Sequence, residues 1–120
     1  MKTRALVLML AAGLAACQKP LPEIEPLTGG SPRLGQQLIE RHGCAACHQI
    51  KGIANAESKV GPSLKEIRQS GYVGGVLPNS ADNLVKWIMD PRAVSPKTAM
   101  PDLGLTQEEA RHVAAYLYSQ

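Results

Sequence analysis

The sequence predicts a small all-α domain of three to four helices. Apolar residues recur at helical spacing in three segments, at about residues 32–42, between Ser80 and Pro91, and at about residues 107–118. No alternating, strand-like run precedes Cys44. The 120 residues include no Phe, one Trp and three Tyr, with nine Pro and eleven Gly, which is thin material for a packed core. This composition leaves room for a flat, largely apolar macrocycle.

The first residues have the pattern of an export signal. Lys2 and Arg4 precede an apolar run over residues 5–16, which is too short for a stable membrane anchor but suits a secretory signal. The run ends in small residues before Cys17, and this resembles the signal of bacterial lipoproteins, in which the cysteine is lipidated and becomes the new N-terminus. We therefore expect a signal peptide over residues 1–16 and a lipid on Cys17. The alternative is plain secretion with a spare thiol at Cys17.

Residues 17–31 are rich in Pro and Gly and show no apolar period, so we expect a lipidated N-terminus with a flexible tether, followed by a folded domain over residues 32–120. Removal of residues 1–16 leaves 11 basic against 10 acidic residues, a net charge of +1. A nearly neutral chain gives no support for nucleic-acid binding.

The helices are predicted with their ends. The first puts Gly35 and Ile39 on one face; the second has Ser80 as its N-cap and stops at Pro91. The last helix has Thr106 as N-cap and Glu109 to complete a capping box. Its apolar face consists of Ala110, Val113, Ala114 and Leu117.

Residues 41–50, "RHGCAACHQI", carry the chemistry. A disulfide between Cys44 and Cys47 would close a tight, strained loop, and a redox dithiol would follow a strand, which is not indicated before Cys44. A zinc site with His48 would need a fourth ligand, His42 or His112, and a second ligand pair. C-x-x-C-H is instead the attachment sequence for c-type haem. Two thioether bonds would capture one edge of the porphyrin, and His48 would reach the iron.

The motifs "GCAACH", "VGPSL", "WIMDP", "TAMPDLGLT" and "AAYLYS" follow one another in an order that resembles a small single-haem cytochrome c. The resemblance covers residues from about 33 to 120. Within it, residues 71–106 are especially similar to the cytochrome c domains fused to subunit II of some haem–copper oxidases. It implies the small cytochrome c fold, with three to four helices around one covalently bound haem c per chain.

The resemblance also implies roles for single residues. The Pro62 carbonyl would accept a hydrogen bond from His48. The plain structural alternative, compatible with that role, is a simple turn before a short helix starting near Ser63. Tyr72, Asn79 and Trp87 would lie near the haem propionates. The first and last helices would cross at Gly35 and Tyr116, and Ile39 departs from the aromatic residue usual at its position.

Two methionines, Met89 and Met100, remain as candidates for the second iron ligand once the signal peptide is removed. Met89 continues the helical spacing of Leu84, Val85 and Ile88, so it is expected to pack. Met100 lies in a proline-rich stretch without any period, where the resemblance places the distal ligand. We predict His48 and Met100 as the iron ligands.

Iron held on both faces has no vacant position, so we predict an electron carrier and not an enzyme. It would be exported, lipid-anchored to a bacterial membrane and monomeric, with its domain facing the periplasm or outer surface. Its redox partners would include, in one reading, a terminal oxidase. Alternatives are a fixed haem subunit of an oxidase complex, or a haem enzyme or gas sensor in which Met100 dissociates. An excess of basic residues between Arg41 and Arg68 is expected to steer partner docking.

Overall fold

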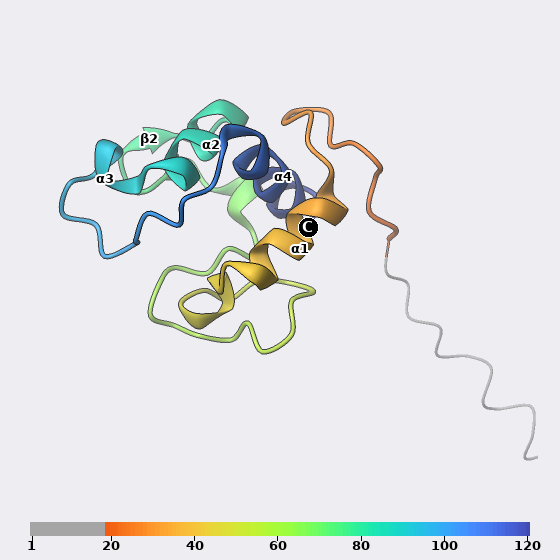
Figure 1. Ribbon diagram of the computed structural model, residues 1–120, viewed down its shortest axis with the longest axis horizontal. Helices are drawn as coiled ribbons and strands as arrows, with labels where there is room; N and C mark the ends of the chain where they lie inside the picture. Colours follow the sequence, from red (N-terminus) through yellow and green to blue (C-terminus); the bar gives the residue numbers. More distant parts are fainter. Residues whose placement is uncertain (1–18) are drawn as a thin grey trace, which may run out of the picture.

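The computed structural model describes residues 19–120, and two crossed helices form its centre (Figure 1). Helix α1 spans Pro32–Arg41 and helix α4 spans Gln107–Tyr118. They cross at Gly35, where an added Cβ would collide with the backbone carbonyl of His112 and lie 3.0 Å from the Cβ of Tyr116. The predicted crossing at Gly35 and Tyr116 is therefore present, and Ile39 is fully buried beside it.

Both predicted ends of α4 and the start of α1 agree with the structure. Thr106 and Glu109 form the expected capping box, with the Thr106 N–H donating to Glu109 and the Glu109 N–H donating to the Thr106 hydroxyl. Ser31 caps α1, which ends one residue before the expected His42. The four residues predicted for the apolar face of α4 are all buried.

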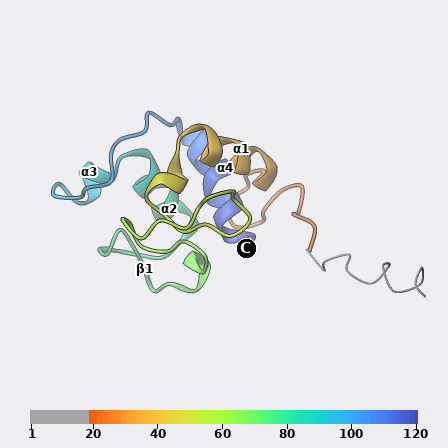
Figure 2. The ribbon, with the colours of Figure 1, turned by 90° about the horizontal axis from the view of Figure 1, so that it is seen from below.

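The remaining elements pack on one side of this pair. Helix α2 (Ala81–Met89) begins at the Ser80 cap and contacts α4, and the single turn α3 (Pro91–Val94) follows directly, capped by the Asp90 side chain. Strands β1 (Tyr72–Val73) and β2 (Leu77–Pro78) form an antiparallel hairpin before α2, with Val73 opposite Leu77. Figure 2 shows this hairpin region beside α2. The all-α prediction with three to four helices is confirmed, with the hairpin as a small addition.

Two short 3₁₀ turns complete the described chain: η1 (Cys44–Ala46), directly after α1, and η2 (Ile67–Gln69). The short helix expected near Ser63 is not formed, and this prediction is wrong. The Ser63 hydroxyl accepts a hydrogen bond from the Lys65 N–H, two residues on, which makes a local turn in place of a helix cap. The helical turn comes later, at η2.

The structure also differs from the predicted start of the folded domain at residue 32. Glu25 and Thr28 are 1% exposed, and a Cβ on Gly30 would collide with the backbone carbonyl of Arg111. The Glu25 carboxylate accepts hydrogen bonds from the N–H groups of Leu27 and Thr28, at 3.0 and 2.7 Å. Residues 25–31, named here the strap, are therefore packed against the helices. The sequence does not predict this packing, because the strap is rich in Pro and Gly and makes its contacts through backbone groups and one carboxylate.

Candidate functional site

The site begins at the turn that follows α1. Gly43 takes a left-handed conformation (φ 69°), which ends the helix and opens η1. The N–H groups of Cys47 and His48 then both donate to the Cys44 carbonyl, at 3.2 and 3.0 Å. This compact turn brings the two cysteines and the histidine onto one short stretch, with both thiols free and half-buried.

The first thiol of this turn is partly withdrawn from solvent. Burial raises the pKa of the Cys44 thiol, with a smaller opposing effect from a backbone hydrogen bond. A reactive redox cysteine is instead held as a thiolate by a lowered pKa. The raised pKa of Cys44 is thus the opposite of what a reactive redox cysteine needs.

The orientation of His48 is set by the next loop. Its Nδ1 lies 2.7 Å from the Pro62 carbonyl oxygen. Because a carbonyl can only accept, Nδ1 must carry the hydrogen, and the lone pair of the neutral ring is then on Nε2. This is the tautomer that a metal-binding histidine needs, with a carbonyl as the partner behind it.

Gly61 makes this arrangement possible, and its role was missed in the sequence. A Cβ at this position would lie 2.6 Å from His48 Cε1 and 2.8 Å from Nδ1, so that the imidazole rests against bare backbone. The Gly61 N–H also donates to the Cys47 carbonyl at 2.6 Å. The motif "VGPSL" contains this glycine directly before the proline, but only the proline and its carbonyl were predicted to have a role.

Comparison with known families shows which family of proteins this chain belongs to. Residues 33–120 match the family model described as Cytochrome c. The chain belongs to the cytochrome c family. Membership implies a haem c and its iron, which agrees with the thiols, the histidine tautomer and the aromatic-poor core described above.

Two relatives share the domain. The chain is 30% identical over 98 residues to the "Cytochrome c oxidase subunit 2" of Alkalihalophilus pseudofirmus, and 28% identical over 87 residues to the protein of the same name from a Bacillus species. These matches cover 81% and 69% of this chain, but only 28% and 24% of the relatives. The chain thus spans about a quarter of the length of these relatives. No solved structure matches it at a significant level.

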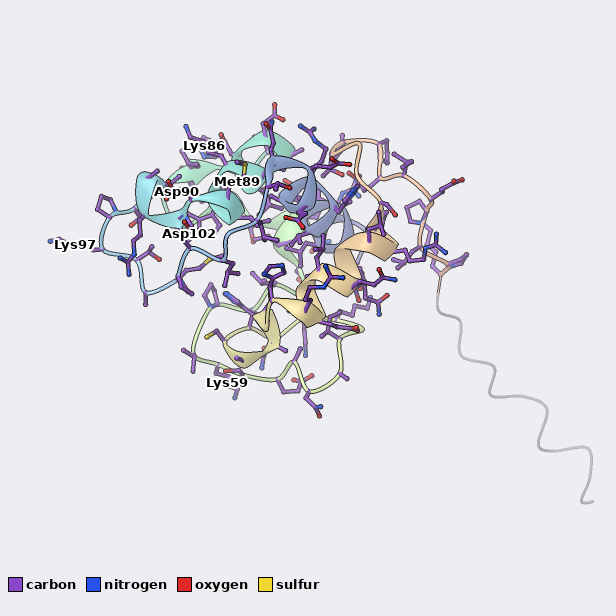
Figure 3. The ribbon with its side chains drawn as sticks, in the orientation of Figure 1. Lys59, Lys86, Met89, Asp90, Lys97 and Asp102 are labelled. Atoms are coloured by element: carbon purple, nitrogen blue, oxygen red, sulfur yellow. The ribbon has the colours of Figure 1, made fainter. Side chains whose placement is uncertain are left out.

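The two candidate methionines of this cytochrome lie in different settings. Met89, labelled in Figure 3, is the last residue of α2 and packs against the hydrophobic core. It also borders a shallow hollow with Val85 of α2 and Arg111 of α4. Met100 lies in the irregular chain between α3 and α4, half-buried, with its N–H donating to the Thr98 hydroxyl at 3.2 Å. These surroundings are consistent with a packing role for Met89 and leave Met100 as the candidate ligand.

The aromatic candidates both belong to the hairpin region. Tyr72, in β1, is 64% exposed, and its phenol is open to solvent. Trp87, on α2, is half-buried, and its ring lies against the backbone of Gly74 in the hairpin turn, where any side chain would collide with it. The structure therefore couples α2 to the hairpin through Trp87, and Gly74 is a second position that sequence reasoning missed.

Asn79 has a structural task in the described chain. Its Nδ2 donates to the carbonyls of Ile67 and Ser70, at 2.6 and 2.8 Å, and its Oδ1 accepts from the Tyr118 hydroxyl at 2.6 Å. Both amide hydrogens are thus used within the protein, and a carboxylate could receive one only by displacing a carbonyl. Asn79 locks η2, the hairpin and the end of α4 together.

Of His42 and His112, the two histidines that could have supplied a fourth zinc ligand, His112 has a structural contact. His112 lies on α4, and its Nδ1 accepts a hydrogen bond from the Ser31 N–H at 2.9 Å.

The predicted lipidation at Cys17 lies outside the described residues. Within residues 19–120, no helix is both long and apolar enough to cross a membrane.

Proposed function

We propose that this protein is a membrane-tethered electron carrier with one haem c per chain, held by thioether bonds to Cys44 and Cys47. The observation that carries the proposal is the His48 imidazole, whose Nδ1 is bonded to the Pro62 carbonyl and whose Nε2 is thereby left with a lone pair. A bound haem supplies an iron that takes up and releases one electron. The turn of Cys44–His48 supplies attachment and one axial ligand from a single short stretch of backbone.

We propose Met100 as the ligand on the opposite face. Its loop joins α3 to α4 without regular structure and contains Pro96 and Pro101, so its backbone has few conformations to lose on ordering. With His48 and Met100 both bound, neither face of the iron is open to a substrate or a gas. Tyr72, Asn79 and Trp87 are proposed as the haem surroundings, with Asn79 acting through the loop it holds.

The carrier proposal is tested by ligand binding and by redox cycling of the mature protein. The ferrous protein should exchange single electrons with small redox mediators and should not bind carbon monoxide. Met100→Ala should open the iron and permit carbon monoxide binding. Rapid carbon monoxide binding by the unmodified protein would instead favour the gas-sensor or enzyme alternative.

Attachment is tested by Cys44→Ala with Cys47→Ala. This double variant should lose haem under denaturing conditions, and, because the aromatic-poor core depends on the macrocycle, most of its helix content as well. A stably folded variant without haem and with native helix content would contradict the proposed role of the haem in the core.

The lipid anchor is proposed at Cys17, which would place the domain on the outer side of a bacterial membrane. Cys17→Ser should release a soluble, still red protein from the membrane fraction, because each buried methylene of an acyl chain contributes about 0.8 kcal/mol to anchoring. Retention of the variant in the membrane to the same extent would mean that something else holds it.

The proposed partners are redox proteins, including a terminal oxidase, as the names of the two relatives suggest. Of the basic residues near the attachment turn, Lys65 pairs with Glu57 at 3.3 Å and Arg68 lies 3.7 Å from Glu25, so both are engaged within the chain. Lys59 has no ion-pair partner among residues 19–120 and lies on the loop after the turn, on the side away from Lys86 (Figure 3). We propose that Lys59 and Lys51, both in the chain that follows the attachment turn, face an acidic partner surface.

Charge reversal separates a diffusing carrier from a fixed subunit. Lys59→Glu should slow electron transfer to the oxidase at low salt and should leave the haem spectrum unchanged, whereas the control Lys86→Glu should have little effect. The effect of Lys59→Glu should fade as salt rises, because the Debye length is about 10 Å at 0.1 M. If the rate of electron transfer depends neither on salt nor on either charge reversal, the protein is instead a fixed subunit of an oxidase complex. This is the alternative that the oxidase relatives also support.

A further inference from the structure

The strap fixes where the chain enters the domain. Its Thr28 carbonyl accepts a hydrogen bond from Arg111 Nη1 at 3.0 Å, and its Ser31 N–H donates to His112, so both contacts are to α4. Its buried Glu25 faces Arg68, whose Nη1 also donates to the Tyr118 carbonyl at 2.8 Å. The strap is therefore held at several points along α4 and at η2.

Exposed apolar side chains are concentrated in this part of the chain. Seven large apolar side chains are exposed among residues 19–120, and four of them belong to the strap, the residues just before it and the first turn of α1. These four, named here the apolar edge, are Leu21, Ile24, Leu27 and Leu34. Ile24 and Leu27 are 54% and 59% exposed, although Thr28, next to Leu27, is buried. The strap thus turns its polar atoms inward and its largest apolar groups outward, the reverse of an ordinary surface turn.

The apolar edge is close along the chain to the proposed lipid. A fully extended chain from Cys17 could reach Leu21 within about 14 Å and Glu25 within about 28 Å. The exposed charges beside the edge are Lys19, Glu23 and Arg33, a small positive excess that suits an anionic lipid surface.

We propose that the apolar edge rests in the interfacial layer of the membrane that holds the lipid on Cys17. This inference depends on the proposed lipidation and adds an orientation to it: the domain is held with its strap toward the bilayer and does not swing on a long tether. The strap precedes α1 and the attachment turn follows it, so the two lie at opposite ends of the helix (Figure 1). The Cys44–His48 turn is thereby directed away from the lipid, toward partners that approach from the aqueous side.

Thiol labelling tests this orientation on the haem-loaded protein. With Cys44 and Cys47 bonded to haem and Cys17 lipidated, a cysteine introduced by Ile24→Cys is the one free thiol. Val76→Cys is the matched control, because Val76 lies in the hairpin turn and is also 54% exposed. Each variant is placed in vesicles of phosphatidylethanolamine and phosphatidylglycerol and labelled with a membrane-impermeant maleimide, beside its soluble Cys17→Ser counterpart.

On vesicles the Ile24→Cys thiol should label slower by about tenfold or more than in the soluble counterpart, since an interfacial side chain is withdrawn from water. The Val76→Cys thiol should label at the same rate in both. Equal labelling of the two thiols on protein that floats with the vesicles would overturn the orientation while leaving the lipid anchor intact.

Two further outcomes would also overturn it, and they are distinguishable. If the mass of the mature N-terminus shows no lipid and the protein does not float, the anchor fails and the orientation fails with it. If Ile24→Cys is protected in the soluble protein as concentration rises, and sedimentation shows a dimer, the apolar edge is an interface with a second copy.

Discussion

Replacement of Gly61 by alanine tests how the histidine is held. The new Cβ would lie 2.6 Å from His48 Cε1 and 3.2 Å from the Cys47 carbonyl oxygen, whereas ordinary contact begins near 3.4 Å. The imidazole cannot retreat without giving up its 2.7 Å hydrogen bond to Pro62. The backbone at Gly61 is not in the left-handed region, so the effect comes from the collision alone.

The size of the effect follows from two contributions. Overpacking of a filled site costs about 1–3 kcal/mol. Loss or distortion of the His48–Pro62 hydrogen bond adds about 0.5–1.5 kcal/mol. Together they amount to about 2–4 kcal/mol, which for a domain of this size lowers Tm by on the order of 10–20 °C. The reduction potential should also move, because the partner of a ligating imidazole tunes its basicity.

The measurement is thermal unfolding of the haem-loaded protein with a redox titration, and Gly71→Ala is the matched control. A Cβ on Gly71 would meet no heavy atom within 4 Å, and its φ is not positive. That variant should be neutral or more stable by about 0.4–1 kcal/mol, through the unfolded chain. If Gly61→Ala and Gly71→Ala have the same Tm and the same reduction potential, close packing of Gly61 against His48 does not hold the imidazole in place.

Three further predictions concern the scaffold. Gly35→Ala should drive a Cβ into the backbone of α4 and cost about 3 kcal/mol in thermal unfolding, and an unchanged Tm would contradict the close crossing. Tyr118→Phe should leave Asn79 Oδ1 without its 2.6 Å donor and lower the denaturant midpoint by the equivalent of about 1–2 kcal/mol, with the m-value unchanged. The Thr106 N–H lowers the pKa of Glu109 below its ordinary 4.5, so its stabilisation of α4 is complete above that pH and is lost as the pH falls further. Unfolding of Glu109→Gln and the unmodified protein should therefore differ at pH 7 and converge as the pH falls through the lowered pKa, and a constant difference would refute the assignment.

The sequence predicted the helices well because their signals are local. Ser80, Thr106 and Glu109 are capping residues whose hydrogen bonds span only three positions, and each caps as expected. The proximity of the two cysteines and His48 could be predicted equally well, because all three belong to one turn. Their predicted roles in binding haem rest on the motif and on the family.

The parts that were missed depend on contacts between distant segments. Glu25 stands in a proline-rich stretch typical of a tether, and only its approach to Arg68, 43 positions away, shows that it is buried. Gly61 and Gly74 have no side chain that indicates a role in the sequence. In the structure, the His48 ring packs against Gly61 and the Trp87 ring packs against Gly74. A glycine needed for close approach looks like a glycine needed for a turn until the partner is placed.

The central claim is that His48 and Met100 close both faces of one haem iron. The measurement that tests it most directly is the ferric absorption band that reports a methionine sulfur on iron, recorded on the mature protein and on two variants. The band should be present in the unmodified protein and in Met89→Ala, and absent in Met100→Ala. A band that survives Met100→Ala, or that disappears in Met89→Ala, would contradict the proposed ligand set.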